Sequence, residues 1–409
     1  MVILLQHNVR ILGQNDNFMK NKQYIYTLSI LCLLQLNCNY ERIDDLTAST
    51  DCAETGTPKA AFIFNNDNCS YPCVIQFTNL SNNACFYTWN FGDGTVGSVK
   101  EDAEHGYVNS GSFEVKLIAS NGIKSQNDTT TLTVQINGTS SQLEDNDLQL
   151  VWVEGGEFEM GCNESACNTE NSDCAASGTD CQCLDSECPK HLVRIDGFFI
   201  GKFEITNDQF YKFLNSLSPW NPRLYISQDE TCLRTSPFKI DAVSEYNSLE
   251  PVICLTYEGA KSYSNWLTQN VSLNGALPTE AQWEFAARGG NERKGYLYAG
   301  SDNIDLVANY NVDENTELSN VGLRGANELG IRDMTGNVWE LCEDYYDRNY
   351  YNFGEANNPV NSTANSNGRV IRGGSIDSPP KFCRVSNRFW DEPTVTNQNF
   401  GFRVVLNPR

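Results

Sequence analysis

Two stretches of this chain decide how its second half folds, namely LPTEAQWEFAAR at residues 277–288 and DMTGNVWE at residues 333–340. The first predicts a helix that starts at Pro278-Thr279-Glu280 and runs to about Arg288, where Gly289-Gly290 ends it. Two further amphipathic helices are expected upstream, at about 207–217 with Thr206 as N-cap and at about 258–269. Beyond Gly290 the pattern changes to loops and short strands, so residues 149–409 are expected to form one α+β domain.

The second stretch brings oxygen ligands together. Gly336, Val338 and Glu340 are spaced by two, so an extended backbone turns two carbonyls and one carboxylate to the same side. Asp333 adds a second carboxylate from the preceding turn. These are ligands that calcium accepts, and a carboxylate-capped turn without an ion is the alternative interpretation.

Residues 57–137 have a different pattern, with short runs of alternating apolar and polar residues. Strands are expected near 61–64, 74–77, 85–91, 113–118 and 131–136, which together predict an all-β sandwich. Trp89 and Phe91 alternate into its core, and Asp93-Gly94 is expected to form a hairpin turn. His105 is interpreted as a structural residue beside that turn. Residues 138–148 are polar and form a linker to the second domain.

The composition excludes several classes of protein. Asp and Glu number 52 against 29 Lys and Arg, which gives a net charge of −23 and argues against nucleic-acid binding. The three histidines, His7, His105 and His191, are too few for a histidine-based metal centre or a confident Ser-His-Asp triad. Sixteen cysteines indicate an exported, oxidised protein.

The N-terminus also indicates export. Lys20 and Lys22 precede an apolar run at 24–36, which has the length of a signal-peptide core and is too short to span a membrane. Cys38 follows, and the arrangement resembles the lipobox of bacterial lipoproteins. We therefore expect an upstream extension and signal peptide at 1–37, lipid attachment at Cys38 and a tether at 38–56. The membrane would then be a partner through a lipid anchor in the cell envelope of a bacterium. Cleavage and secretion without lipid is the alternative.

Motifs that follow one another in a set order give two family resemblances. The second domain carries VEGGEFEMG (153–161), FEITN (203–207), PVI (251–253), the two stretches above, RGGS (372–375) and NFGFR (399–403). This set resembles the formylglycine-generating enzyme, or sulfatase-modifying factor, family across 149–409. The resemblance implies a C-type-lectin-like fold with bound calcium. In the first domain, YTWNFGDG (87–94), HGY (105–107) and GSFEV (111–115) resemble a PKD domain, which implies an immunoglobulin-like sandwich acting as a spacer or adhesive module.

The same resemblance bears on catalysis. The enzymes of the family bind one Cu(I) between two cysteines that follow Gly-Gly-Ser, because soft thiolates suit Cu(I). Here Ser378 stands at the first of these positions and only Cys383 remains. We therefore expect a non-catalytic domain that acts in binding or assembly, with a protein or glycan partner and no copper. The alternative is a formylglycine-generating oxidoreductase that converts a sulfatase cysteine with the help of different residues.

Further residue roles follow from the resemblance. Asp333, Gly336, Val338 and Glu340 match a structural calcium site of the family, and members of unknown activity imply a disulfide between Cys342 and Cys383. Cys232 and Cys254 remain and most simply pair with each other. Six cysteines at 162–188 are expected to form disulfides, with zinc as the alternative. His191, in a family Glu-x-Pro-x-His pattern, is interpreted as a structural histidine bonded to a backbone group.

Overall fold

The computed structural model describes most of the chain after residue 55. The described residues are 56–65, 69–122, 126–138, 147–162, 185–217, 225–226, 248–269, 273–311, 317–352, 356–364, 368–392 and 398–409. The predicted signal peptide, Cys38 and most of the tether lie outside these ranges. Within them, no helix combines the length and the apolar character that a membrane crossing needs.

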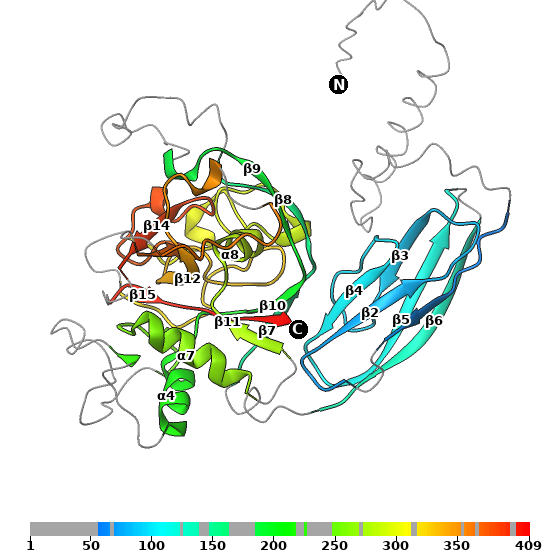
Figure 1. The fold of residues 1–409 in the computed structure, drawn as a ribbon, viewed down its shortest axis with the longest axis horizontal. Helices are drawn as coiled ribbons and strands as arrows, with labels where there is room; N and C mark the ends of the chain where they lie inside the picture. Colours follow the sequence, from blue (N-terminus) through cyan, green and yellow to red (C-terminus); the bar gives the residue numbers. More distant parts are fainter. Residues whose placement is uncertain are drawn as a thin grey trace, which may run out of the picture. The chain divides into compact units, whose positions relative to one another are not determined.

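The first domain is a sandwich of two three-stranded antiparallel sheets (Figure 1). Trp89 and Phe91 are buried between them, as predicted, with Phe77 5.6 Å from Trp89 and 5.4 Å from Phe91 between ring centroids. One sheet has the order β1-β2-β4, made of β1 (Phe62–Phe64), β2 (Cys73–Asn79) and β4 (Ala103–Tyr107). The other has the order β3-β5-β6, made of β3 (Phe86–Asn90), β5 (Gly111–Ser120) and β6 (Asn127–Ile136).

The predicted hairpin at Asp93-Gly94 is wrong. The strand before the turn, β3, pairs with β5, whereas the strand after it, β4, pairs with β2 in the other sheet. The turn therefore carries the chain across the sandwich. His105 on β4 closes it, because its Nε2 lies 2.7 Å from Oδ2 of Asp93 and its ring stacks on Phe91 at 4.0 Å. Burial alone would raise the pKa of Asp93, but the hydrogen bond and charge of His105 lower it. His105 is thus the structural residue that the sequence predicted.

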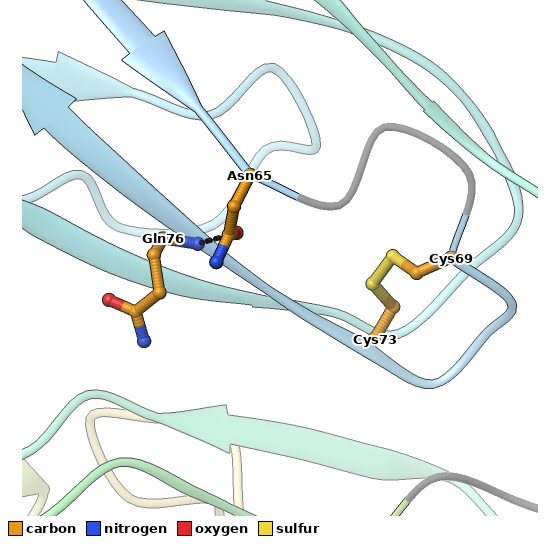
Figure 2. Close-up of a disulfide and its surroundings, with 4 residues drawn as sticks. All are labelled: Asn65, Cys69, Cys73 and Gln76. Atoms are coloured by element: carbon orange, nitrogen blue, oxygen red, sulfur yellow. Dashed lines mark hydrogen bonds between the residues drawn. A yellow bond between two sulfur atoms is a disulfide. The ribbon is translucent and has the colours of Figure 1, made fainter.

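A disulfide closes the loop that leads into β2. Cys69 and Cys73 are bonded, with 6.0 Å between their Cα atoms (Figure 2). In the same region Asn65 Oδ1 accepts a hydrogen bond from the backbone N–H of Gln76 at 2.9 Å, which ties the end of β1 to β2. Cys85 is also disulfide-bonded.

The second domain has three sheets and three described α-helices (Figure 1). Its core strands order as β11-β16-β10-β7 and β14-β13-β12-β15, and β8 pairs with β9. The strands are β7 (Leu150–Val153), β8 (Gly156–Met160), β9 (His191–Ile195), β10 (Phe198–Gly201), β11 (Leu273–Ala276), β12 (Trp339–Tyr345), β13 (Arg369–Arg372), β14 (Arg388–Asp391), β15 (Phe400–Gly401) and β16 (Val405–Pro408). The helices are α4 (Asn207–Ser216), α7 (Tyr257–Leu267) and α8 (Glu280–Ala287).

All three predicted helices are confirmed within a few residues. Thr206 caps α4 as expected. Its hydroxyl accepts a hydrogen bond from the backbone N–H of Gln209, and the Gln209 side-chain oxygen accepts one from the backbone N–H of Thr206. Thr279 forms the same capping box with Gln282 at the start of α8. Gly289 follows α8 with φ of 94°, a conformation that glycine adopts without strain. Between α8 and the C-terminus, the only helical elements among the described residues are short 3₁₀ turns, at 290–292, 304–306, 350–352 and 380–382.

Candidate functional site

The segment after Gly374 holds one buried thiol. Cys383 has no exposed surface and packs with Tyr298 and Val307. Its Sγ lies 3.8 Å from the carbonyl oxygen of Ser378. A Cβ on Gly374 would come within 2.6 Å of this sulfur, so position 374 must be glycine to leave room for the thiol. Burial raises the pKa of Cys383 to about 12, which keeps the thiol protonated at neutral pH.

Ser378 fills the position beside this thiol. Its Oγ lies 3.2 Å from Oγ of Ser375 and accepts the backbone N–H of Ser375 at 3.0 Å. These hydroxyls are hard, neutral ligands, whereas Cu(I) prefers soft thiolates. One protonated thiol, with serine in place of cysteine at position 378, does not fit the paired-thiolate copper site that the family resemblance implies.

The predicted disulfide between Cys342 and Cys383 is wrong, because both residues are free buried thiols. Cys342 lies on β12 two residues after Glu340, so it shares the face of the strand that packs against α8. Its cluster includes Trp283, and Cys383 belongs to a separate cluster. The direction of the strand therefore separates two cysteines that the resemblance paired. Burial also raises the pKa of Cys342 well above that of an ordinary thiol.

Other cysteine predictions fall partly outside the described residues. Cys254 is disulfide-bonded, and Cys232, its predicted partner, lies outside the described ranges. Cys162 and Cys188, the two ends of the six-cysteine segment, are disulfide-bonded rather than free to hold zinc. The four cysteines between them also lie outside those ranges.

The turn at 333–338 contains several residues with left-handed backbone. Asp333, Gly336 and Asn337 have φ values of 60°, 78° and 63°, so three left-handed residues fall within five positions. A Cβ on Gly336 would approach the carbonyl oxygen of Asn309 to 2.2 Å, and the position therefore requires glycine. Asp333 is buried, and its Oδ2 accepts the backbone N–H of Gly322 at 2.6 Å. Burial raises the pKa of Asp333 to about 6.

Glu340 is paired with an arginine. Nε and Nη2 of Arg403 donate to its two oxygens at 2.6 Å each, and the indole N–H of Trp283 donates to Oε2 at 2.7 Å. Oε1 thus accepts one of these three bonds and keeps a lone pair for a further ligand. Glu340 and Arg403 have no exposed side-chain surface.

A third carboxylate belongs to this cluster, and the sequence patterns did not single it out. Glu204, in the FEITN motif, accepts from Asn337 Nδ2 at 2.7 Å and from Val338 N at 3.2 Å. Its burial, and then the charges of Asp333 and Glu340, raise the pKa of Glu204 well above its usual range. The three buried carboxylates, those of Glu204, Asp333 and Glu340, outnumber the buried guanidinium of Arg403.

The carbonyls of Gly336 and Val338 with the carboxylates of Asp333 and Glu340 still fit calcium, because all four are hard oxygen donors. In the described part of the chain no three His, Cys, Asp or Glu side chains form a metal-binding group by themselves. Such a site would therefore depend on the two backbone carbonyls as well as on carboxylates. The motifs that supply Glu204 and Arg403 were visible in the sequence, but their convergence was not.

A second buried network of arginines and glutamates lies beside Trp283, where the guanidinium carbon of Arg372 is 5.1 Å from the ring centroid. Nε and Nη2 of Arg388 donate to the two oxygens of Glu280 at 2.7 and 2.6 Å, and Arg372 contacts Glu280 at 3.3 Å. Arg372 also pairs with Glu284. These pairs join α8 to β13 and β14, and all four side chains are buried.

The family Glu-x-Pro-x-His segment, residues 187–191, is also held by a buried pair of a glutamate and an arginine. Glu187 is fully buried and receives two 2.7 Å bonds from Arg384, together with bonds from Ser386 and Asn387. His191 Nδ1 lies 3.1 Å from the carbonyl oxygen of Pro189, which confirms the predicted backbone contact. Both residues are therefore interpreted as structural.

The chain matches known proteins in both domains. A family model described as the sulfatase-modifying factor enzyme 1-like domain matches residues 137–408, and a PKD domain model matches residues 57–136. The serine/threonine-protein kinase Pkn1 of Chlamydia trachomatis serovar L2 is 29% identical over 264 residues, covering 62% of this chain and 38% of that protein. The chain thus spans well under half the length of this relative.

Two further matches concern the second domain. The formylglycine-generating enzyme of Streptomyces coelicolor is 26% identical over 302 residues, covering 62% of this chain and 87% of the enzyme. The structure of PvdO from Pseudomonas aeruginosa gives a TM-score of 0.50 at 22% identity, covering 63% of this chain and 94% of PvdO. At this identity the likeness to PvdO concerns the fold alone.

Proposed function

Because the chain belongs to the sulfatase-modifying factor enzyme 1-like family over residues 137–408, with a PKD domain ahead of it, we propose that its family domain is a non-catalytic module for binding or assembly. A protein or glycan is its partner, and the net charge of −23 argues against nucleic acid. Copper is not its cofactor. The PKD domain serves as a spacer or a second adhesive module.

One observation carries this proposal, namely the buried thiol of Cys383 beside Ser378. A copper oxidase of this type needs two thiolates, and Ser378 places a hydroxyl at the first of the two positions. Cys383, at the second position, has a pKa of about 12, raised by burial. Cys342 offers no substitute, because it lies in a different core cluster.

The test is a Cu(I) titration of the full chain with its disulfides intact, together with an assay for formylglycine on a peptide carrying a sulfatase cysteine motif. We expect no stoichiometric thiolate-to-copper absorption band and no product. A band that titrates to one copper per chain, together with product formation, would establish the alternative oxidoreductase and refute the proposal.

Calcium is proposed as a structural ion of the same domain, held by Asp333, Gly336, Val338 and Glu340. A divalent cation would offset the excess of buried carboxylates around Arg403 and would join the turn at 333–338 to β12. Calcium supplies charge and geometry here, and no reactive step depends on it.

We expect a calcium chelator to lower the Tm of the full chain by at least about 5 °C, since an ion bound only in the folded state stabilises that state. Asp333→Ala, which removes the side-chain oxygens, should abolish most of this response, whereas Glu292→Ala, at an exposed carboxylate, should preserve it. Differential scanning calorimetry measures the response of the natural chain and of both variants. An unchanged Tm after chelation, or an equal response in Asp333→Ala, would exclude calcium at this turn.

Lipid attachment at Cys38 remains a proposal that depends on the N-terminal pattern of Lys20, Lys22 and the apolar run at 24–36. It places the protein in the cell envelope of a bacterium, which is an oxidising compartment where disulfides persist. Cys38→Ser should release the chain from the membrane fraction and remove the lipid mass from its N-terminal peptide. Cys52→Ser, in the same predicted tether, is the matched control and should leave the chain on the membrane. Membrane association that persists in Cys38→Ser would argue for another anchor or none.

A further inference from the structure

The PKD domain ends in a long edge strand, β6. This strand is the last in its sheet and pairs with β5 through ten consecutive residue pairs without a bulge (Figure 1). Its end is covered, because the loop closed by Cys69 and Cys73 bonds to Asn137 through Cys69 O and Tyr71 N. Among the described residues, no other strand pairs along the outer side of β6. Alternate backbone N–H and C=O groups of an edge strand point outward and are available to a further strand.

This edge also lacks the usual protection against strand pairing. Natural edge strands carry Lys, Pro or a bulge, or they are very short. The sequence of β6, NDTTTLTVQI, contains neither Lys nor Pro, and Asp128 is its single charge. Its threonines favour extended backbone, and Leu132 keeps 38% of its surface exposed. The edge is therefore long, regular and nearly neutral in a strongly acidic chain.

The strand is complementary to itself when it is read in the opposite direction. We propose that β6 pairs with β6 of a second copy of this chain, antiparallel and centred on Thr131, to form a two-fold symmetric dimer. In that register Thr131 faces its own copy and Thr129 faces Thr133. On the same face, Asn127 lies opposite Gln135. Cross-strand Thr–Thr pairs are favourable contacts, and the side-chain amides of Asn127 and Gln135 can hydrogen-bond to each other.

The charges agree with this register. Asp128 lies opposite Val134, so the two Asp128 side chains fall at opposite ends of the new strand pair rather than facing each other. The two sheets would join into one that runs β3-β5-β6-β6-β5-β3, and the pairing is isologous, so it closes at two copies. Because each chain carries a net charge of −23, added salt should strengthen the dimer by screening repulsion between the copies.

The test measures the association state of the full chain by sedimentation velocity over a concentration series. The natural chain should show a monomer–dimer equilibrium that shifts toward dimer when salt is raised from about 50 to about 500 mM, which shortens the screening length. Thr131→Lys places two like charges at the two-fold axis and should raise the dimer Kd by at least about tenfold. Thr88→Lys, at an exposed position of β3 in the same sheet, is the matched control and should leave the Kd unchanged.

Cross-linking tests the register directly. In an antiparallel pair, facing residues bring their Cα atoms to about 4.5–5.5 Å, which is within the range of a disulfide. Thr131→Cys should therefore give a disulfide-linked dimer on a non-reducing gel, and Thr88→Cys should not. A chain that is monomeric at every concentration, a dimer that tolerates Thr131→Lys, or equal cross-linking of both cysteine variants would overturn the proposal. The last two outcomes would assign the dimer to another surface.

Discussion

Ser378→Cys is expected to give the chain a Cu(I) site. Position 378 is next to the buried thiol, since the carbonyl oxygen of Ser378 lies 3.8 Å from Cys383 Sγ. A second sulfur there would supply the soft ligand pair that Cu(I) prefers. Metal binding displaces thiol protons, so the pKa of about 12 at Cys383 opposes binding without preventing it. We expect Cu(I) affinity to rise at least about a thousandfold, or about 4 kcal/mol, measured by competition with a Cu(I) chelator.

Two controls make this result specific. Ser375→Cys introduces a sulfur at the neighbouring serine, whose hydroxyl lies 3.2 Å from that of Ser378. Ser378→Cys combined with Cys383→Ser keeps the new sulfur and removes the natural thiol. Neither should gain the affinity of Ser378→Cys. If all three variants bind copper alike, the new site does not use Cys383, and the missing cysteine would no longer support the proposal that the family domain is non-catalytic.

The second large effect is expected at Glu280. Its carboxylate receives two hydrogen bonds from Arg388 and lies 3.3 Å from Arg372, and all three side chains are buried. Glu280→Gln removes the negative charge and leaves the positive charge of both guanidiniums less compensated. Breaking a buried pair in this way costs about 3–5 kcal/mol. We expect the Tm of the family domain to fall by about 10 °C in calorimetry.

Glu258→Gln provides the matched control. Glu258 occupies the first turn of α7, as Glu280 occupies the first turn of α8, but its side chain is exposed. Both substitutions remove a favourable contact with the helix dipole, which is worth less than about 1 kcal/mol at an exposed site. An equal loss of Tm in the two variants would mean that the buried arginine network contributes little to stability.

The sequence was sufficient to predict the architecture, because helix caps and apolar alternation are local features and the family motifs follow one another in a set order. Thr206, Thr256 and Thr279 start the three helices through capping bonds to residues three positions away, so the helices could be predicted from local sequence. The alternation of Trp89 and Phe91 placed the core of the sandwich. The family motifs predicted the sulfatase-modifying factor domain and the PKD domain, and the comparisons confirm both. The absence of a cysteine at Ser378 was also readable from the sequence, and the chemical proposal depends on it.

Tertiary structure decided which distant residues meet. Cys342 and Cys383 lie 41 positions apart in the sequence. The face of β12 on which Cys342 lies places its thiol in a core cluster that does not include Cys383. The Asp93-Gly94 turn crosses between sheets because strand pairing, which is not local, assigns β4 to β2. Glu204 reaches the turn at 333–338 from a motif more than a hundred residues upstream. A motif records which side chains are present, but burial, direction and charge partners arise only when the segments pack together.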